Sequence, residues 1–156
     1  MERLAVFVQV GMPWLSAGCH HVMASLVHRG GYPGSADGFA ASAGFRNRYQ
    51  LSRILQREGL PSLEELAGWI RLLTWVAAWE ASRVPLSQAA LRSLRDPAPM
   101  FRLVERLTGR TWTEVRALGA DWVFLRLLDR CRPADAPACP GDEAIPMGSP
   151  VAGRAS

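Results

Sequence analysis

The stretch that decides the fold is Gly44–Leu66, which reads GFRNRYQLSRILQREGLPSLEEL. Its leucine and isoleucine residues recur at helical spacing, so a helix is predicted over about 46–58. A glycine and a proline then break the helix. Ser62, followed three residues later by Glu65, has the spacing of a capping box. This pair predicts the start of a second, long and mostly apolar helix over 63–82, which should be buried.

An internal repeat with an offset of 49 residues carries this pattern into the C-terminal half without a gap. One register aligns arginines, capping residues and apolar positions, which indicates a duplicated unit. Two units are too few for a solenoid, and a pair of helix-turn-helix units is the natural alternative. The matches are Arg46 with Arg95, Arg53 with Arg102, Arg57 with Arg106, Ala40-Ala41 with Ala89-Ala90, Ser62 with Thr111, Glu65 with Glu114, Phe45 with Leu94, Leu51 with Met100, Ile54 with Leu103, Leu55 with Val104 and Leu66 with Val115.

The whole chain is therefore predicted to be all-α, with two helix-turn-helix subdomains joined by a long buried connector helix. Residues 1–13 are mostly apolar, and their sequence is compatible with either a short strand or a buried extended segment. The predicted parts are an N-terminal segment over 1–34 with one helix (14–29) that packs on the first unit, a first helix-turn-helix over 35–62, a connector helix over 63–84, a second helix-turn-helix with a closing helix over 85–132, and a disordered tail over 133–156.

One face of the predicted helix over 46–58 suits the major groove of double-stranded DNA. At about 100° per residue, its arginine and glutamine side chains share a sector opposite the apolar residues. Arginine can bond guanine bidentately, glutamine can bond adenine, and marginal arginines can neutralise phosphates. An ordinary solvated basic face is the alternative interpretation. The candidate DNA-binding residues of this helix are Arg46, Asn47, Arg48, Tyr49, Gln50, Ser52, Arg53 and Arg57.

The second predicted recognition helix, over about 98–107, is less suited to reading bases. Pro97, Ala98 and Pro99 occupy its entry, where polar side chains would be expected. We therefore expect this helix to contribute weaker contacts or contacts to the DNA backbone. Its candidate residues are Arg95, Phe101, Arg102 and Arg106.

The charge of the chain indicates an anionic partner. The formal net charge is +4, and residues 44–132 carry 15 arginines against 9 acidic residues, a local balance of +6. Nucleic acid and an anionic membrane surface are the usual partners of such a chain. All 18 positive side chains are arginine, which fits phosphate and guanine recognition and fits equally a GC-rich coding sequence.

The cellular setting expected from the sequence is the cytoplasm. Three cysteines without a dense framework are atypical of a disulfide-stapled secreted domain. The apolar run over 66–79 contains Arg71 and is shorter than a membrane span, so no transmembrane helix is expected. The apolar segment over 4–10 is preceded only by Glu2 and Arg3, whose charges cancel, so no exported leader is expected.

Several stretches resemble the DNA-binding domain of AraC/XylS-type transcription regulators. They are Gly44-Phe45, Leu51–Leu55 and Leu103–Arg116, and the resemblance spans about Ser35–Leu118. It implies two helix-turn-helix units on a connector helix, double-stranded DNA as the partner and transcription regulation as the function. RNA polymerase is a further candidate partner of such a regulator, and tandem units allow a monomer to bind DNA.

The resemblance also assigns base-facing positions, and the sequence departs from the family pattern in the second unit. There, Ser93-Leu94 stands where the family has Gly-Phe, and Trp112 stands where a proline is common. These departures affect the DNA contacts of the second unit. The base-facing positions that the resemblance implies are Tyr49, Ser52 and Arg53 in the first unit and Phe101 and Arg102 in the second.

Other functions have weaker support in the sequence. Cys19, His20, His21 and His28 lack the spacing of a metal site, and Cys19 and His20 point apart on a helix, so no metal, cofactor or catalytic residue is expected. The chain is not expected to be an enzyme. The alternative that stays open is a helical protein-interaction module, with the six tryptophans as a docking surface, or a degenerate paralogue without specific DNA binding.

Overall fold

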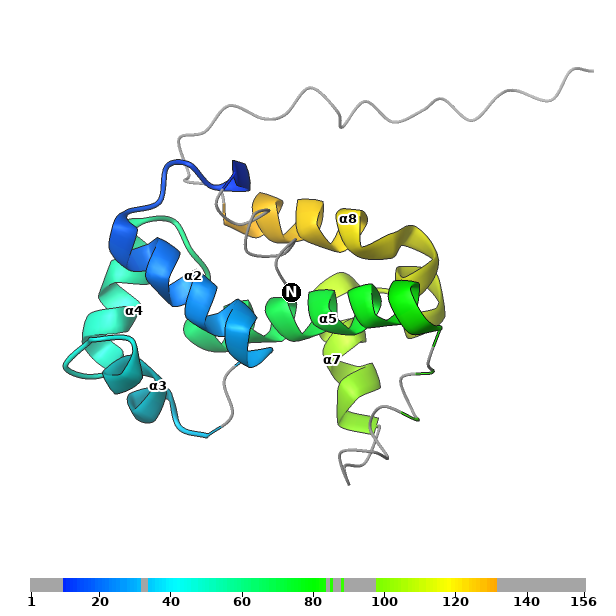
Figure 1. Ribbon diagram of the computed structural model, residues 1–156, viewed down its shortest axis with the longest axis horizontal. Helices are drawn as coiled ribbons and strands as arrows, with labels where there is room; N and C mark the ends of the chain where they lie inside the picture. The colour runs from blue at the N-terminus through cyan, green and yellow to red at the C-terminus, as the bar shows by residue number, and fades with distance from the viewer. Residues whose placement is uncertain (1–9, 32–33, 84, 86–87, 89–97, 132–156) are drawn as a thin grey trace, which may run out of the picture.

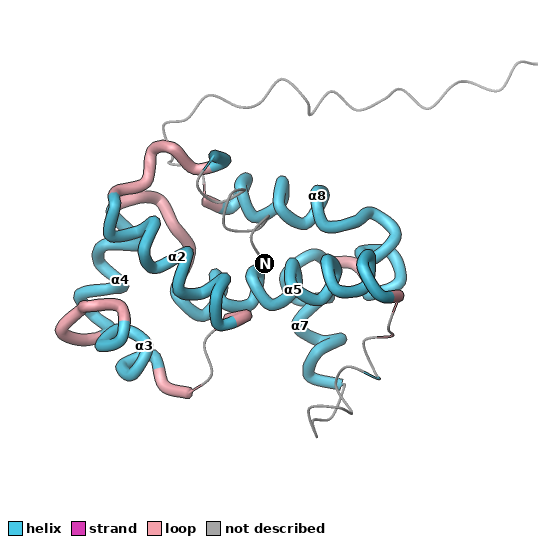
Figure 2. Tube along the Cα trace, viewed as in Figure 1, coloured by secondary structure: helices cyan, strands magenta, loops and turns pink. Residues whose placement is uncertain are grey.

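The computed structural model describes residues 10–31, 34–83, 85, 88 and 98–131, and within these ranges every regular element is a helix (Figures 1 and 2). The all-α prediction is thereby confirmed for the described residues. In chain order the helices are α2 (Ala17–Arg29), α3 (Ala36–Ser42), α4 (Arg48–Arg57), α5 (Leu63–Ser82), α7 (Ala98–Thr108) and α8 (Trp112–Arg130).

Helix α5 runs through the middle of the molecule (Figure 1). Helix α8 lies along it, α7 crosses it on another side, and α2, α3 and α4 gather at its N-terminal end. Eight of its twenty residues are buried, among them Trp69 and Ile70. The predicted long buried helix over 63–82 is therefore confirmed, with the same bounds. It forms the centre of one hydrophobic core that takes in residues from α2 to α8.

The two predicted capping boxes differ in the structure. The hydroxyls of Ser62 and Thr111 both accept a hydrogen bond from the backbone N–H three residues on, so both are N-caps. Only Glu114 completes its box, by accepting the N–H of Thr111 at 2.8 Å. The carboxylate of Glu65 instead pairs with Arg130 at 2.7 Å. The prediction of a box at Ser62 was half wrong, because a partner distant in sequence takes the carboxylate and ties the start of α5 to the end of α8.

Helix α4 begins two residues later than predicted, at Arg48 rather than Arg46. Asn47 has an extended backbone, and its side chain accepts the N–H of Gln50 at 2.9 Å. An asparagine in this role ends the preceding turn and starts the helix. Arg46 and Asn47 therefore precede the helix, which corrects their predicted place on its face.

The register of the internal repeat reappears in the burial of side chains. Leu55 and its counterpart Val104 are both buried, as are Leu66 and Val115. Leu51 is buried, whereas its counterpart Met100 is only half-buried. Several predictions concern residues outside the described ranges. They are the start of the second helix-turn-helix, with the repeat partners Ala89, Ala90, Leu94 and Arg95, the tail over 133–156 and the segment over 1–9. Residues 10 and 11 are helical, so no strand occurs there.

A kink divides α8 at Gly119. The backbone there has φ 89° and ψ 174°, a conformation that is essentially restricted to glycine. The kink exposes the N–H of Ala120, which donates to Glu80 Oε1 at 2.9 Å. The end of α5 thereby caps the second half of α8. A side chain at Gly119 would also meet this carboxylate, since an added Cβ would lie 2.8 Å from Glu80 Oε1.

We expect Gly119→Ala to destabilise the protein by about 2–3 kcal/mol, because it combines backbone strain with a clash against Glu80. Urea unfolding followed by circular dichroism measures the change. Gly18→Ala is the control: it lies in the exposed first turn of α2, where an added Cβ has room, and should stabilise by about 0.5 kcal/mol. Equal stabilities of the two variants would contradict this account of the kink.

Candidate nucleic-acid interface

The turn between α3 and α4 holds the two helices against each other. Helix α3 is capped by Ser35 and buries Phe39 and Ala40. The N–H of Phe45 closes the turn by donating to the carbonyl of Ala40 at 2.9 Å. Asp37 reaches across and accepts the N–H of Arg48 at 3.2 Å. The first turn of α4 is thereby fixed by a carboxylate eleven positions earlier.

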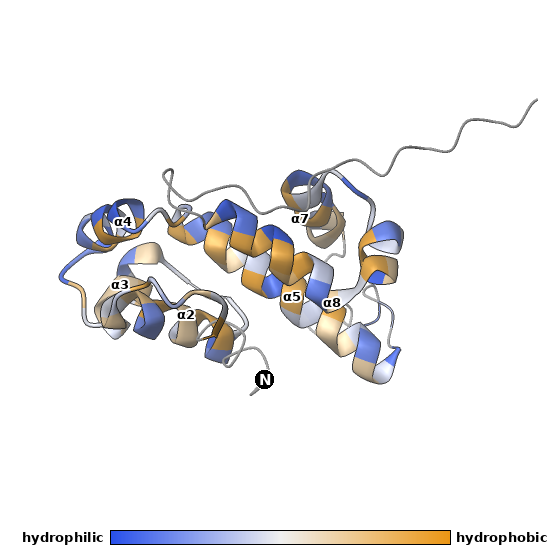
Figure 3. Ribbon diagram, turned by 90° about the horizontal axis from the view of Figure 1, so that it is seen from above, coloured by the Kyte–Doolittle hydropathy of each residue, from blue (hydrophilic) through white to orange (hydrophobic). Residues whose placement is uncertain are grey.

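Helix α4 buries only Leu51 and Leu55 and leaves its other face exposed. Figure 3 shows this helix at an edge of the molecule with a largely hydrophilic surface. Tyr49 is 64% exposed, and the guanidinium group of Arg48 lies over its ring, 5.0 Å from the centroid. All eight predicted residues of this region are exposed: Arg46, Asn47, Arg48, Tyr49, Gln50, Ser52, Arg53 and Arg57.

The arginines of this face differ in how far their charge is balanced. Arg48 lies 4.0 Å from Asp37 and donates to the hydroxyl of Tyr49 at 3.0 Å. Arg57 lies 3.9 Å from Glu58. Arg46 and Arg53 form no ion pair with any residue that the structure describes. The unbalanced guanidinium groups of Arg46, just before α4, and of Arg53, in the middle of α4, favour an anion at this face.

Gln50 has a structural role that the helical wheel did not indicate. Its side-chain oxygen accepts the N–H of Arg46 at 2.8 Å, while its own N–H donates to Asn47. These two bonds cap the start of α4. The predicted role of Gln50 in reading adenine would require its oxygen to share or leave this bond, so Arg53 and Tyr49 are the stronger candidates for base contacts.

The predicted residues of the second unit do not share one exposed face. Arg102 and Arg106 are exposed on α7, one turn apart. Phe101 is half-buried and packs against the hydrophobic core, which argues against its expected base-facing role. Arg95 lies outside the described residues.

Arg71 is a further, partly exposed arginine near α7 that the sequence motifs did not indicate. It lies on α5 and lines a hollow together with Arg102 and Arg106 of α7. The sequence held a signal for it, because Arg71 is the one charged residue in the apolar run over 66–79. Its neighbours on α7 are about thirty positions away, so the cluster itself could not be found from spacing.

Glu58 connects the C-terminal end of α4 to the start of α2. Its carboxylate accepts the N–H of Ser16, the N-cap of α2, at 2.8 Å, and its side chain is only 12% exposed. Burial opposes the charged form, but hydrogen bonds from Ser16 and Cys19 and the nearby Arg57 outweigh it, so the pKa of Glu58 is lowered. The ionised carboxylate therefore joins the first helix to the end of α4.

We expect Glu58→Gln to lower stability by about 1 kcal/mol at pH 7, because the folded state favours the ionised carboxylate. A lowered pKa gives stabilisation that is present above the ordinary pKa of glutamate and lost as the pH falls through the lowered value. The deficit should therefore be smaller at pH 3 than at pH 7. Urea unfolding at both pH values tests this, with the exposed Glu105→Gln as the control; a deficit of the same size at pH 3 would contradict it.

The two described cysteines are buried and unsuited to nucleophilic chemistry. Burial, with a hydrogen bond to Glu58, raises the pKa of Cys19 to about 11, and burial raises the pKa of Cys131 to about 12. Both thiols are protonated at neutral pH. Among the described residues, no group of three histidine, cysteine or acidic side chains is placed to hold a metal ion.

None of the helices in the described ranges is long and apolar enough to cross a membrane. Comparison of the chain with protein-family models, with curated proteins and with solved structures gives no match. The resemblance to AraC/XylS-type regulators therefore stays a hypothesis, and the function has to be argued from the geometry of this surface.

Proposed function

We propose that the chain binds double-stranded DNA in a sequence-specific manner and acts as a transcription regulator. In this proposal α3 and α4 form the first helix-turn-helix, and α4 enters the major groove. Helix α7 belongs to the second unit and contributes weaker contacts or contacts to the backbone. The observation that carries the proposal is the exposed surface of α4 and the turn before it, where Arg46 and Arg53 form no ion pair with a described residue.

The shape of this face supports the proposal. Helix α4 has ten residues, about 15 Å of helix, a length that fits within the major groove. Its side chains combine a guanidinium group, a phenol and a hydroxyl in Arg53, Tyr49 and Ser52. Such groups reach both base edges and phosphates. In Figure 3, α4 and α7 lie toward the same edge of the molecule, so one duplex could meet both.

The alternative of a tryptophan-based docking surface has less support. Trp69 and Trp112 are buried, and Trp75, Trp79 and Trp122 are half-buried. Only Trp14 is exposed. The tryptophans thus serve mainly the core and its margin. A degenerate relative that has lost specific DNA binding differs from a regulator only in its affinity for particular sequences, which an experiment can measure.

We expect the purified chain to enrich a motif of about one or two helical turns from a random library of duplex DNA. Arg53→Ala should weaken binding to that motif by about 10-fold or more and relax the preference at one position, since a lost bidentate contact costs about 1–3 kcal/mol. Arg126→Ala, which removes an exposed arginine paired with Asp129 on α8, is the control and should bind as the wild type does. Absence of any motif with folded, monodisperse protein would refute sequence-specific recognition.

A further inference from the structure

A hollow of about 560 Å³ lies between α5 and α7. Its described lining contains no acidic residue and brings together guanidinium groups from two helices. Arg102 and Arg106 lie one helical turn apart on α7, and like charges at this spacing repel each other. The residues that line the hollow are Arg71, Pro99, Arg102, Leu103 and Arg106.

The close approach of α5 and α7 creates this arrangement. At Gly68, an added Cβ would lie 3.3 Å from methyl groups of both Leu103 and Leu107, so α7 packs tightly on the backbone of α5. Arg71 is one helical turn further along α5, and Arg102 and Arg106 neighbour the two leucines on α7. The packing of these leucines on α5 thus brings the three arginines to the lining of one hollow.

The first half of the chain fixes the position of Arg71. An added Cβ at Gly31, just after α2, would lie 2.7 Å from Arg71 Nε and 2.8 Å from its Cγ. The arginine side chain therefore passes directly over the Gly31 backbone, where φ is +98°. This contact links the end of α2 to the hollow, so the site depends on both halves of the fold.

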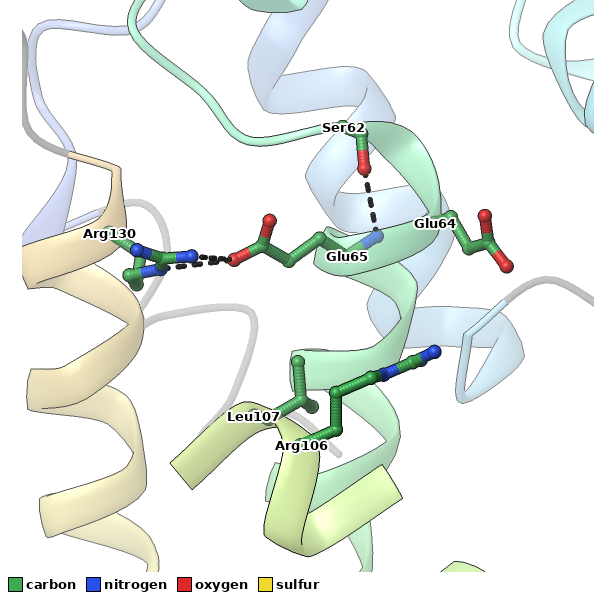
Figure 4. A pocket seen from close by; sticks show the side chains of 6 residues that line it. All are labelled: Ser62, Glu64, Glu65, Arg106, Leu107 and Arg130. Carbon is green, nitrogen blue, oxygen red and sulfur yellow. Dashed lines mark hydrogen bonds and ion pairs between the residues drawn. The ribbon is translucent and has the colours of Figure 1, made fainter. Parts of the chain in front are cut away.

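Arg106 also lines a second hollow, together with Ser62, Glu64, Glu65, Leu107 and Arg130. Figure 4 shows that its side chain points away from the Glu65–Arg130 pair there. Neither Arg102 nor Arg106 forms an ion pair with a residue in the described ranges. Three convergent guanidinium groups suit a phosphate, because each offers a planar fork of N–H donors to its oxygens.

We propose that the hollow formed by Arg71, Arg102 and Arg106 binds a phosphate group of the DNA backbone. The inference rests on the proposed function, and it assigns to the connector helix a contact that does not read sequence. A phosphate seated there would hold the duplex at the junction of the two units while α4 reads bases. Its contribution should be the same for every DNA sequence and should fall with salt.

The test uses the full chain and two duplexes, the selected motif and a scrambled sequence, with affinity measured by fluorescence anisotropy over a range of salt. Arg71→Gln should weaken binding to both duplexes by a similar factor, about 3- to 30-fold at low salt, and reduce the salt slope by about 1. Arg126→Gln removes the same charge from α8 and should leave affinity and slope unchanged. Arg102→Gln, an exposed residue, replaces Arg71→Gln if that variant does not fold.

The outcomes separate this inference from the proposed function. Wild-type affinity and slope in Arg71→Gln, or a loss confined to the motif duplex, would overturn the backbone contact. If the wild type binds no DNA, the proposed function fails, and a titration with inorganic phosphate then tests whether the hollow binds phosphate at all. A rise in Tm with phosphate that Arg71→Gln abolishes would support a phosphate site of another origin, whereas no such rise would refute the site.

Discussion

The burial of α5 against α2, α7 and α8 is the constraint on which the other features depend. A twenty-residue helix that is apolar on most of its surface has to be covered on several sides to leave water. The two halves of the chain supply that cover from different directions. The core is continuous from Leu15 in the first half to Leu127 in the second, so the two halves share one hydrophobic core and are not separate domains.

This packing determines where charge can lie. No polar or charged residue among those described is buried, so each described arginine is at least partly exposed. The exposed surface at α4 and α7 carries Arg46, Arg53, Arg102 and Arg106, none of which forms an ion pair with a residue that the structure describes. The acidic residues are used elsewhere, as Glu58 joins α2 to α4, Glu80 caps the second half of α8 and Glu65 binds Arg130. Acids that tie helices together leave the proposed DNA surface basic.

Most helix boundaries could be predicted because their signals are local. Ser35, Ser62 and Thr111 each cap a helix through a residue three positions away, and Gly30 ends α2 in a left-handed conformation. The start of α4 was misplaced, although an asparagine at position 47 is itself a strong cap signal. The exposure of Arg53 and Ser52 on α4 was predicted correctly. The predicted base-facing position of Phe101 was not, because its half-burial depends on packing against the core.

The sequence by itself determined the helices, their caps, the apolar character of α5 and the repeat, because these follow from contacts within about four residues and from periodicity. Tertiary structure alone decided which carboxylates pair with distant partners and how Arg71 meets Arg102 and Arg106. The physical reason is that these contacts join residues about 30 to 65 positions apart; the arginine hollow also needs Gly68, where an added Cβ would lie 3.3 Å from two leucines of α7.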